Sequence, residues 1–325
     1  MIRIGVIGIG HLGAIHTKLW ANSLTASLVG IFDVSSIRSE EIAQLHNCTS
    51  FNSIETLIDS VDAVTIASST NTHFEIAKQC IQAGKHCFIE KPITESYQQA
   101  QELIALAKEH SVILQVGHVE RFNPAMVALS EYSVQPKFIE AHRLSQFKPR
   151  AIDVSVVHDL MIHDIDIVLW LVQSPVKSID ASGVNVLTPT IDIANARLTF
   201  ENGCVANLTA SRLSVQAMRK IRMFQENTYF SLDFAKSELE IFRIADADLP
   251  QSQQATMLGT IDAGTIKRSI YYDKPTVTPT NAIEQEHISF VKAIEGKAPI
   301  AVTADDGSEA LRIVELIQEQ CLSKL

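Results

Sequence analysis

The sequence predicts an α/β fold, with a Rossmann domain (a doubly wound parallel sheet) followed by an α/β domain with a large, mostly antiparallel open sheet. Over roughly the first 120 residues, short apolar runs alternate with segments of helical periodicity, which predicts parallel strands covered on both faces. Further along, strand signals follow one another without intervening helices, which indicates antiparallel pairing. The length of 325 residues is enough for two domains.

The first domain is expected at residues 1–122. Its strands are predicted at 2–7, 27–32, 63–67, 86–89 and 112–116. Its helices are predicted at 13–22, 39–45, 72–83 and 97–110. This alternation is typical of a nucleotide-binding fold.

The second domain is expected at residues 123–325 and should bind substrate and form oligomers. Helices are predicted at 124–132, 156–172, 282–295 and 304–321, the last of which is expected to pack back toward the first domain. Strands are predicted at 137–145, 176–186, 194–200, 204–212, 220–224 and 229–234. The polar stretch 245–281, which contains Pro250, is predicted as a long loop with one strand at 266–271.

Composition excludes several classes of protein. Lys plus Arg is 27 and Asp plus Glu is 37, so the net charge of −10 disfavours nucleic acid and anionic membrane surfaces as partners. The five cysteines include no CxxC pair, which disfavours a disulfide framework or a zinc ribbon. No apolar run approaches the ~18 residues of a membrane span. We therefore expect a cytoplasmic protein.

A glycine-rich turn follows the first predicted strand. Residues Gly8 to Gly13 read G-I-G-H-L-G, which matches G-x-G-x-x-G between a strand and a helix. Gly8 permits the tight turn, Gly10 lets the backbone approach a pyrophosphate, and Gly13 lets helix and strand pack closely. The motif predicts a dinucleotide site that includes His11 and Leu12 at the start of the helix.

Asp33 ends the second predicted strand, 20 residues beyond Gly13. A carboxylate there binds a ribose 2′-hydroxyl and repels a 2′-phosphate, so NAD is favoured over NADP. Three polar residues close to Asp33 in sequence would weaken the preference for NAD, so NADP is the alternative cofactor: Ser35, Ser36 and Arg38. The alternative is a strand–turn–helix corner that binds no ligand.

Two further groups of residues carry chemistry. Glu90-Lys91-Pro92 follows an apolar strand, so Lys91 lies at the sheet edge where ligands bind; a cis peptide before the proline is plausible, and a solvated turn pair is the alternative.

Asp159 and His163 are four residues apart on an apolar helix, with Asp166 nearby, which suits a carboxylate that orients a general base. An internal ion pair, a plain surface charge at Asp164, or a metal site are the alternatives; no HExxH is present, and we expect no metal.

In combination, these motifs resemble the Gfo/Idh/MocA family of oxidoreductases over nearly the whole chain. The resemblance rests on residues 8–13, 62–67, Asn71, His73, 90–92, Asp159 and His163. The chain departs from the family pattern in two places, since Ser68-Ser69-Thr70 lacks a proline common in that loop and residues 154–158 lack glycine.

The resemblance implies a role for each motif. Lys91 would hydrogen-bond the reacting oxygen, His163 would take the hydroxyl proton as hydride passes to nicotinamide, and Asp159 would orient the site and contact substrate. Glu90 would lie by the nicotinamide ribose, and Ser68, Asn71 and His73 would belong to the cofactor site. The family's open sheet also implies a homodimer or homotetramer.

Two short segments narrow the expected substrate. Residues 116–124 and 161–166 resemble members that oxidise UDP-N-acetyl-amino sugars at C3. Arg121 and Asn123 would then bind sugar hydroxyls or a phosphate, unless Arg121 only secures the domain junction. Four more basic residues are candidates for holding a diphosphate: Arg150, Arg212, Arg219 and Lys220.

We therefore expect an NAD(P)-dependent oxidoreductase that removes hydride from a sugar secondary alcohol. A dehydrogenase of a free sugar or inositol is the alternative in the same class. A redox-neutral NAD-dependent glycosidase and a non-catalytic NAD- or sugar-sensing protein are the other two. Release of a leaving group without NADH would identify the glycosidase, and binding without turnover would identify the sensor.

Overall fold

The computed structural model describes residues 1–149, 152–246, 255–264 and 266–324, and these form two compact units. The first unit contains Met1–Val119 and Asn281–Arg312, and the second contains Glu120–Thr280 and Ile313–Leu325. The segment 281–312 thus clusters with the nucleotide-binding region, whereas the sequence interpretation placed it in the second domain. Arg150 and Pro250, which the sequence analysis singled out, lie outside the described residues.

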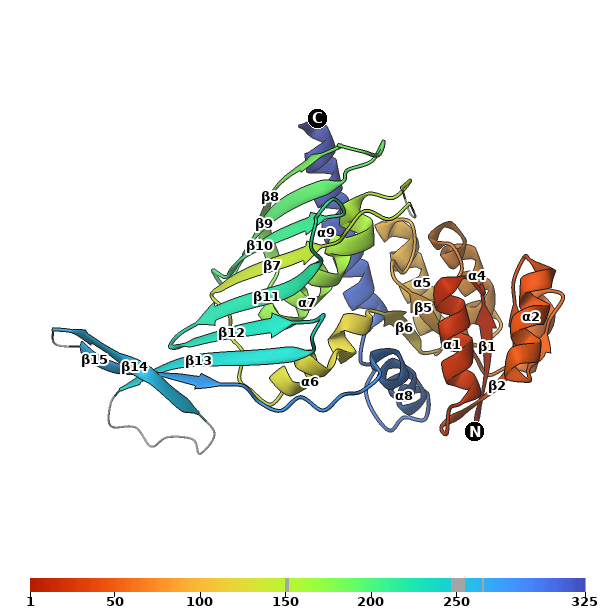
Figure 1. Ribbon diagram of the computed structural model, residues 1–325. Coiled ribbons are helices and arrows are strands. Elements are labelled where there is room, and N and C mark those ends of the chain that lie inside the picture. Colours follow the sequence, from red (N-terminus) through yellow and green to blue (C-terminus); the bar gives the residue numbers. More distant parts are fainter. Residues whose placement is uncertain (150–151, 247–254, 265, 325) are drawn as a thin grey trace. The chain divides into compact units, whose positions relative to one another are not determined.

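A six-stranded parallel sheet forms the centre of the first unit, in the order β3-β2-β1-β4-β5-β6 (Figure 1). The strands are β1 (Ile2–Ile7), β2 (Ala26–Phe32), β3 (Thr49–Ser50), β4 (Ala63–Ile66), β5 (His86–Glu90) and β6 (Leu114–Gly117). Five of the six match the predicted strands, and the two-residue β3 was not predicted because it is too short to show a pattern. The order reverses between β1 and β4, which creates the crevice where dinucleotides bind in such sheets.

Helices connect these strands and supply the apolar surfaces that cover the sheet. They are α1 (His11–Ala21), α2 (Ser36–His46), α3 (Ile54–Ser60), α4 (Thr70–Gln82) and α5 (Tyr97–Glu109), of which α3 was not predicted. Ile4 and Val6 on β1 pack into a core with Trp20 of α1 and Phe290 of α8 (Ala282–Ile294). Burial of these large side chains explains why α8, although distant in sequence, belongs to the first unit.

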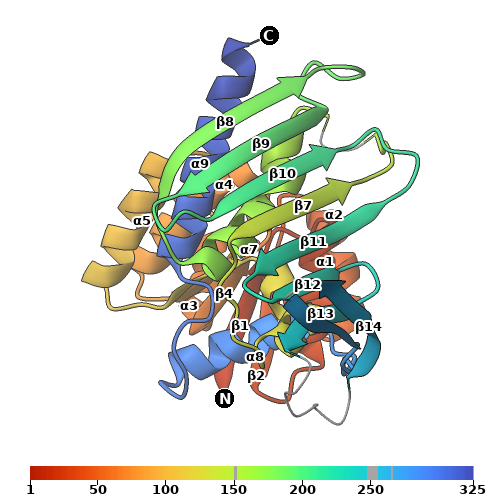
Figure 2. The same cartoon turned by 90° about the vertical axis from the view of Figure 1, so that its left-hand side faces the viewer.

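The second unit contains a nine-stranded sheet in the order β14-β15-β13-β12-β11-β7-β10-β9-β8 (Figure 2). The strands are β7 (Phe138–Leu144), β8 (Val176–Val184), β9 (Ile193–Phe200), β10 (Val205–Ser211), β11 (Met218–Gln225), β12 (Thr228–Asp233), β13 (Glu238–Asp246), β14 (Thr256–Ala263) and β15 (Ile266–Asp273). All pairs are antiparallel except β7 with β10, which is parallel. The predicted fold class, a Rossmann domain with a second, mostly antiparallel sheet, is confirmed.

One part of the prediction for this sheet was wrong. The stretch 245–281 was expected to be a loop with one strand, but β13 extends into it and β14 and β15 form a hairpin that projects from the sheet (Figure 1). Strand β14 has little burial, since Met257, Leu258 and Ile261 remain exposed, whereas Tyr271 on β15 is buried. The predicted strand at 266–271 is confirmed as β15, whereas β14, which is held by backbone pairing and exposes its apolar side chains, was missed.

Helices cover one face of the nine-stranded sheet. α6 (Pro124–Leu129) packs against β12 and β13, and α7 (Ile162–Val172) packs against β7 and β10. The end of α9 (Ala304–Ser323) lies along β8, where Gln320 bonds to the backbone of Ile179 and Ala181. No helix among the described residues is long and apolar enough to cross a membrane.

Asp192 organises the turn between β8 and β9. Its Oδ2 accepts hydrogen bonds from the backbone N–H groups of Val186, Leu187 and Thr188 at 2.7–2.9 Å, and its Oδ1 accepts one from the Thr188 hydroxyl at 2.7 Å. Burial alone would raise the pKa of this carboxyl group, but these hydrogen bonds outweigh it and lower the pKa to about 2.

The Asp192→Asn variant is therefore expected to lose about 2 kcal/mol of stability at pH 7, because an amide cannot accept all four bonds. The native pKa lies below the ordinary value of 3.8, so this stabilisation is present above about pH 4 and disappears as the pH falls toward 2. Calorimetry of both proteins between pH 7 and pH 2 measures the difference. The control Asp180→Asn removes an exposed ion pair with Lys324 and should change stability little. A pH-independent difference would contradict the assignment.

Candidate active site

The glycine turn between β1 and α1 forms the base of the candidate cofactor site. Gly8 has a φ of +86°, and a Cβ there would lie 2.5 Å from the backbone of Ser68 at the end of β4. A Cβ on Gly13 would lie 1.8 Å from the carbonyl oxygen of Gly8, so the helix can approach the turn only with glycine there. A Cβ on Gly10 would meet nothing within 4 Å. Backbone atoms thus pack closely against Gly8 and Gly13, whereas the space next to Gly10 is open to a ligand.

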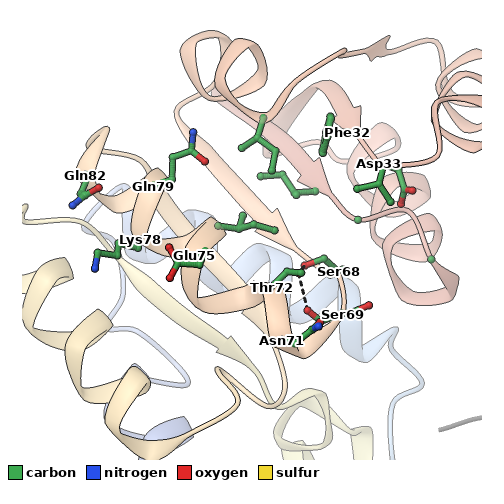
Figure 3. A pocket seen from close by; sticks show the side chains of 17 residues that line it. Phe32, Asp33, Ser68, Ser69, Asn71, Thr72, Glu75, Lys78, Gln79 and Gln82 are labelled. Atoms are coloured by element: carbon green, nitrogen blue, oxygen red, sulfur yellow. Dashed lines mark hydrogen bonds between the residues drawn. The ribbon is translucent and has the colours of Figure 1, made fainter. Parts of the chain in front are cut away.

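The open side of this turn leads into a pocket of about 940 Å³ (Figure 3). Its lining includes the predicted residues Gly8, Gly10, Asp33, Ser68 and Asn71. His11 and Leu12 begin α1, and helix α1 has no side-chain cap on its first N–H groups. Those N–H groups and the helix dipole favour an anion, so the residues present fit the pyrophosphate of a dinucleotide.

Asp33 lies at the end of β2 and faces the glycine turn. Its Oδ2 accepts a hydrogen bond from the Ile9 N–H at 2.6 Å, and its Oδ1 accepts one from the Ser35 N–H at 2.9 Å. Arg38 of α2 donates from Nε to the Ile9 carbonyl at 2.5 Å. The turn, the carboxylate and the guanidinium are therefore held together at the end of the pocket that suits a ribose.

His73 was predicted to bind the cofactor, but the structure gives its ring a positioning role. The buried ring lies between two backbone carbonyls, with Nδ1 2.9 Å from the Pro92 oxygen and Nε2 3.2 Å from the Ser68 oxygen. Burial lowers the pKa of His73, which favours the neutral ring. A neutral ring has a single N–H, so it donates to one of these two carbonyls at a time while it fills the space between the loop after β4 and the loop after β5.

Glu90 and Lys91 lie where β5 ends, at the carboxyl edge of the parallel sheet. Glu90 is buried rather than solvated: its Oε1 is 2.8 Å from Nε2 of His16, and its Oε2 accepts the Lys91 N–H at 3.2 Å. The Lys91–Pro92 peptide bond is cis. The alternative of a solvated turn pair is therefore wrong for Glu90.

Asp159 and His163 lie in the second unit on the predicted helix, whose start differs from expectation. Residues Val157–Met161 form a π-helical turn before α7 begins at Ile162, so one extra residue is accommodated just ahead of His163. Such turns occur frequently at functional sites. Both side chains are half-buried. A backbone hydrogen bond holds the segment just before the π-helical turn: the N–H of Val156 donates to the Ile191 carbonyl at 2.9 Å.

Buried ion pairs hold α7 within the second unit. Asp164 accepts hydrogen bonds from Arg143 of β7, and Arg143 also pairs with Glu120 at 2.8 Å. The alternative that Asp164 is only a surface charge is therefore wrong. Burial raises the pKa of Asp164, and the Arg143 guanidinium opposes that shift.

Arg121 and Asn123, predicted to bind substrate, have internal partners instead. The Arg121 guanidinium forms a bidentate pair with Asp166 at 2.6 and 2.9 Å, and its side chain is 6% exposed. Asn123 caps α6 through the Ala125 N–H and donates to the Phe234 carbonyl. Both side chains thus stabilise the segment at the start of the second unit, and their contact with substrate stays a prediction.

The basic residues expected to hold a diphosphate divide into two kinds. Arg212 is buried, donates to the Val154 carbonyl at 2.5 Å and lies 3.8 Å from Asp192, so it supports the entry to the π turn instead. Arg219 is 57% and Lys220 41% exposed by side chain, and both lie at the start of β11. Only these two of the described candidates retain an exposed positive group.

Sequence reasoning missed several residues of the pocket and its surroundings. Helix α4 contributes a stripe at helical spacing that lines the pocket beyond Asp33: Thr72, Glu75, Ile76, Gln79 and Gln82 (Figure 3). Their spacing was a usable signal, because residues three and four apart share a helix face. His16 and His287, which lie behind Glu90, had no comparable signal because they are 271 residues apart.

The fold and the pocket together define a dinucleotide-binding protein. Residues 2–118 match the profile of an oxidoreductase family with an NAD-binding Rossmann fold, and residues 130–229 match the GFO/IDH/MocA C-terminal domain. A UDP-N-acetylglucosamine 3-dehydrogenase from Acidithiobacillus ferrooxidans is 40% identical over 250 residues, which cover 77% of this chain and 79% of that protein. The chain belongs to the Gfo/Idh/MocA family of NAD-dependent oxidoreductases.

Two further comparisons agree with this assignment. The solved structure of the Acidithiobacillus ferrooxidans enzyme matches with a TM-score of 0.89 at 34% identity, over 99% of this chain and 98% of that one. An inositol 2-dehydrogenase from Rhizobium meliloti is 25% identical over 97% of this chain and 95% of its own length. The predicted family, NAD cofactor and enzyme class are confirmed.

Replacing Asp33 should change the choice between NAD and NADP. The Asp33→Ser variant is expected to shift the ratio of NADPH to NADH affinity toward NADPH on the order of 100-fold, because a repulsion of about 1–4 kcal/mol at ~4 Å is removed. Titration of nucleotide fluorescence measures both dissociation constants. The control Asp59→Ser removes an exposed acid of α3 and should leave the ratio unchanged. An unchanged ratio in Asp33→Ser would refute the role of this carboxylate.

Proposed function

We propose that this enzyme oxidises the C3 hydroxyl of a UDP-N-acetyl-amino sugar, with UDP-N-acetylglucosamine as the first candidate, and passes the hydride to NAD. The observation that carries the proposal is the similarity, over nearly the whole fold, to an enzyme named for that reaction. Lys91, Asp159 and His163 are the residues that we propose for alcohol oxidation. The inositol dehydrogenases are more distant, so inositol is the second candidate.

Three residues divide the chemistry. Lys91 donates a hydrogen bond to the reacting oxygen and stabilises the negative charge that develops on it. His163 accepts the hydroxyl proton, and Asp159 orients the imidazole and contacts the sugar. The nicotinamide ring of NAD supplies the hydride acceptor. The carbon loses hydride and the oxygen loses a proton, which gives the ketone.

Arg219 is the proposed contact for the diphosphate, because it lies on the helix-covered face of the sheet with Ile221 and Met223, whereas Lys220 points to the opposite face with Phe224. Arg219 lies 3.8 Å from Glu120, a carboxylate that already pairs with Arg143 at 2.8 Å. Because Arg143 already neutralises Glu120, Arg219 can pair with a phosphate without leaving that buried carboxylate unpaired.

We also propose a cytoplasmic homodimer or homotetramer. All five cysteines are free thiols, which suits a reducing compartment. Neighbouring rings form a row along the sheet face opposite α6 and α7, with centroids 4.7–6.1 Å apart: Phe138, Phe224, Tyr229, Phe242 and Tyr272. An aromatic row of this kind supports contact with a second copy of the chain.

Phe224→Glu should therefore lower the molar mass measured by light scattering, because it places a charge in the middle of the row, where Phe224 is 38% exposed. Val215→Glu, at a position 87% exposed outside the row, is the control. Equal masses for Phe224→Glu and the unmodified protein would contradict this interface.

The decisive experiment follows NAD reduction at 340 nm with four substrates: UDP-N-acetylglucosamine, UDP-glucose, myo-inositol and glucose. Turnover with UDP-N-acetylglucosamine supports the proposal. Turnover with inositol or glucose alone keeps the family and refutes the nucleotide-sugar substrate. Cofactor binding with no reduction of NAD by any sugar favours the redox-neutral glycosidase or the sensor instead.

A further inference from the structure

Two buried histidines lie behind the Glu90–Lys91 segment of the first unit and have no role in the chemistry described above. Nε2 of His16, on α1, is 2.8 Å from Oε1 of Glu90. Nδ1 of His16 is 2.7 Å from Nε2 of His287, on α8. The exposed fractions of His16 and His287 are 0% and 3%. Three titratable side chains from three elements thus form one hydrogen-bonded chain.

Aromatic side chains enclose this chain. Trp20 stacks on His287 with ring centroids 3.7 Å apart and planes 5° from parallel, and its own N–H donates to Thr65. Phe88 meets His287 edge-on, and Phe290 meets Phe88. In such apolar surroundings direct hydrogen bonds are strong and an uncompensated charge is costly. Burial therefore lowers the pKa of His287 well below its usual value, and the nearby His16 lowers it further.

The hydrogen bonds limit where protons can lie. Burial raises the pKa of Glu90, but the hydrogen bond from His16 and the charge of Lys91, joined by the charge of His16 whenever that ring is protonated, outweigh it and lower the pKa, so Glu90 is ionised. An ionised carboxylate only accepts, so His16 must carry hydrogen on Nε2. One proton then lies between Nδ1 of His16 and Nε2 of His287, and it is bonded to one of these two nitrogens.

Two charge states follow from this count. With His287 donating from Nε2, both rings are neutral and the chain carries the single negative charge of Glu90. If a proton enters at Nδ1 of His287 and the Nε2 proton moves to His16, His16 becomes an imidazolium and the net charge is zero. The second state is reached at lower pH. A proton that binds to His287 on α8 thus produces a positive charge on His16, next to Glu90.

The position of Glu90 connects this charge to the cofactor. Asp33, at the end of β2, marks the adenosine half of the site, and Glu90 ends β5 on the other side of the switch point between β1 and β4. The nicotinamide half of a dinucleotide occupies that side. Other titratable groups near the chain are Lys91 and His73, which interact electrostatically with Glu90, and the buried Glu286 next to His287.

We infer that His16 and His287 are positioning residues that form a proton relay, which orients the Glu90 carboxylate and sets the net charge beside Lys91 and the nicotinamide. The inference rests on the proposed role of Lys91 but not on the identity of the sugar. When the relay is negative, it favours NAD⁺, with its cationic ring, over NADH. Protonation of the relay removes this preference.

The test uses the full chain and two readouts that need no sugar. The ¹⁵N shifts of the histidine rings in the cofactor-free protein should show His16 and His287 titrating as a coupled pair. The ratio of the NAD⁺ and NADH dissociation constants should rise roughly tenfold as pH falls through that titration, the size expected for one unit charge over ~10 Å at an effective dielectric constant of ~20.

Three variants distinguish an effect of the relay's hydrogen bonds from an effect of side-chain packing. His287→Phe keeps an aromatic ring on Trp20 but removes the hydrogen bond, so the pH dependence of the ratio should disappear and kcat should fall about 10- to 100-fold. His287→Gln restores a hydrogen-bonding partner for His16 and should recover most of kcat. Phe290→Leu disturbs the same enclosure without a titratable group, so it should lower Tm and keep the pH dependence.

Several outcomes would overturn the inference. One is a folded His287→Phe protein with the kcat and the pH dependence of the unmodified enzyme. Another is loss of the pH dependence in Phe290→Leu, which would make packing the cause. A third is loss of the pH dependence in Glu286→Gln while His287→Phe retains it, because the titrating group would then be Glu286. If no tested sugar is oxidised but the ring shifts and the cofactor ratio titrate as stated, the substrate proposal fails and the relay stands.

Discussion

Lys91→Met is expected to lower kcat of the dehydrogenase about 100- to 1000-fold, while the dissociation constant for NAD changes little. Lys91 follows the last residue of β5, at the sheet edge where the reacting end of the cofactor is expected. Removal of the ammonium group leaves the developing charge on the substrate oxygen without its donor, and the loss of one such donor has an effect of this size. Steady-state rates at saturating sugar and NAD measure it.

Lys108→Met is the matched control for this prediction. Lys108 lies in the last turn of α5, is exposed and belongs to the same unit. Its rate should equal that of the unmodified enzyme. A Lys91→Met enzyme within threefold of the control would remove Lys91 from the chemistry and would favour a purely structural role for the Glu90-Lys91-Pro92 turn.

His163→Asn is expected to lower kcat about 100- to 10,000-fold and to abolish the acidic limb of the pH–rate profile. A general base must be neutral to accept the hydroxyl proton. The rate of the unmodified enzyme should therefore fall as the pH drops below the apparent pKa of His163, whereas asparagine has no such titration. Profiles of kcat between pH 5 and pH 9 compare the two proteins.

His158→Asn provides a control from the same helical stretch. Nδ1 of His158 lies 3.2 Å from Oε1 of Gln318 and 3.3 Å from Oγ of Ser155, so the ring already has partners within the second unit. Its variant should be less stable but should keep the shape of the pH profile. Loss of the acidic limb in His158→Asn and its retention in His163→Asn would transfer the base to His158.

The cofactor half of the site was predictable because its parts are local in sequence. A strand, a glycine turn and a helix are joined by short connections, and the steric need for glycine at positions 8 and 13 follows from backbone geometry alone. Asp33 ends the next strand and therefore reaches the same turn. The apolar periodicity also located five of the six parallel strands.

The partners of the polar side chains were not predictable in the same way. Arg121 and Asn123 were expected to face substrate, yet each bonds within the second unit. A sequence pattern shows that a residue is charged and near a motif, but a buried charge takes whichever opposite group the packed fold presents to it. The contact of Arg212 with the Val154 carbonyl and the hydrogen bonds of Asp192 within the β8–β9 turn were not predictable for the same reason.

The sequence by itself determined the Rossmann domain, the family and the NAD cofactor, because each depends on short-range spacing and residue type, and it predicts the site residues Asp33, Lys91 and His163 on the same basis. Only the tertiary structure placed α8 on the first sheet, paired β7 in parallel with β10, and joined Glu90, His16 and His287. Periodicity reveals which face of an element is buried but not what covers it. Contacts between segments up to 271 residues apart are therefore set by the packing of the whole chain.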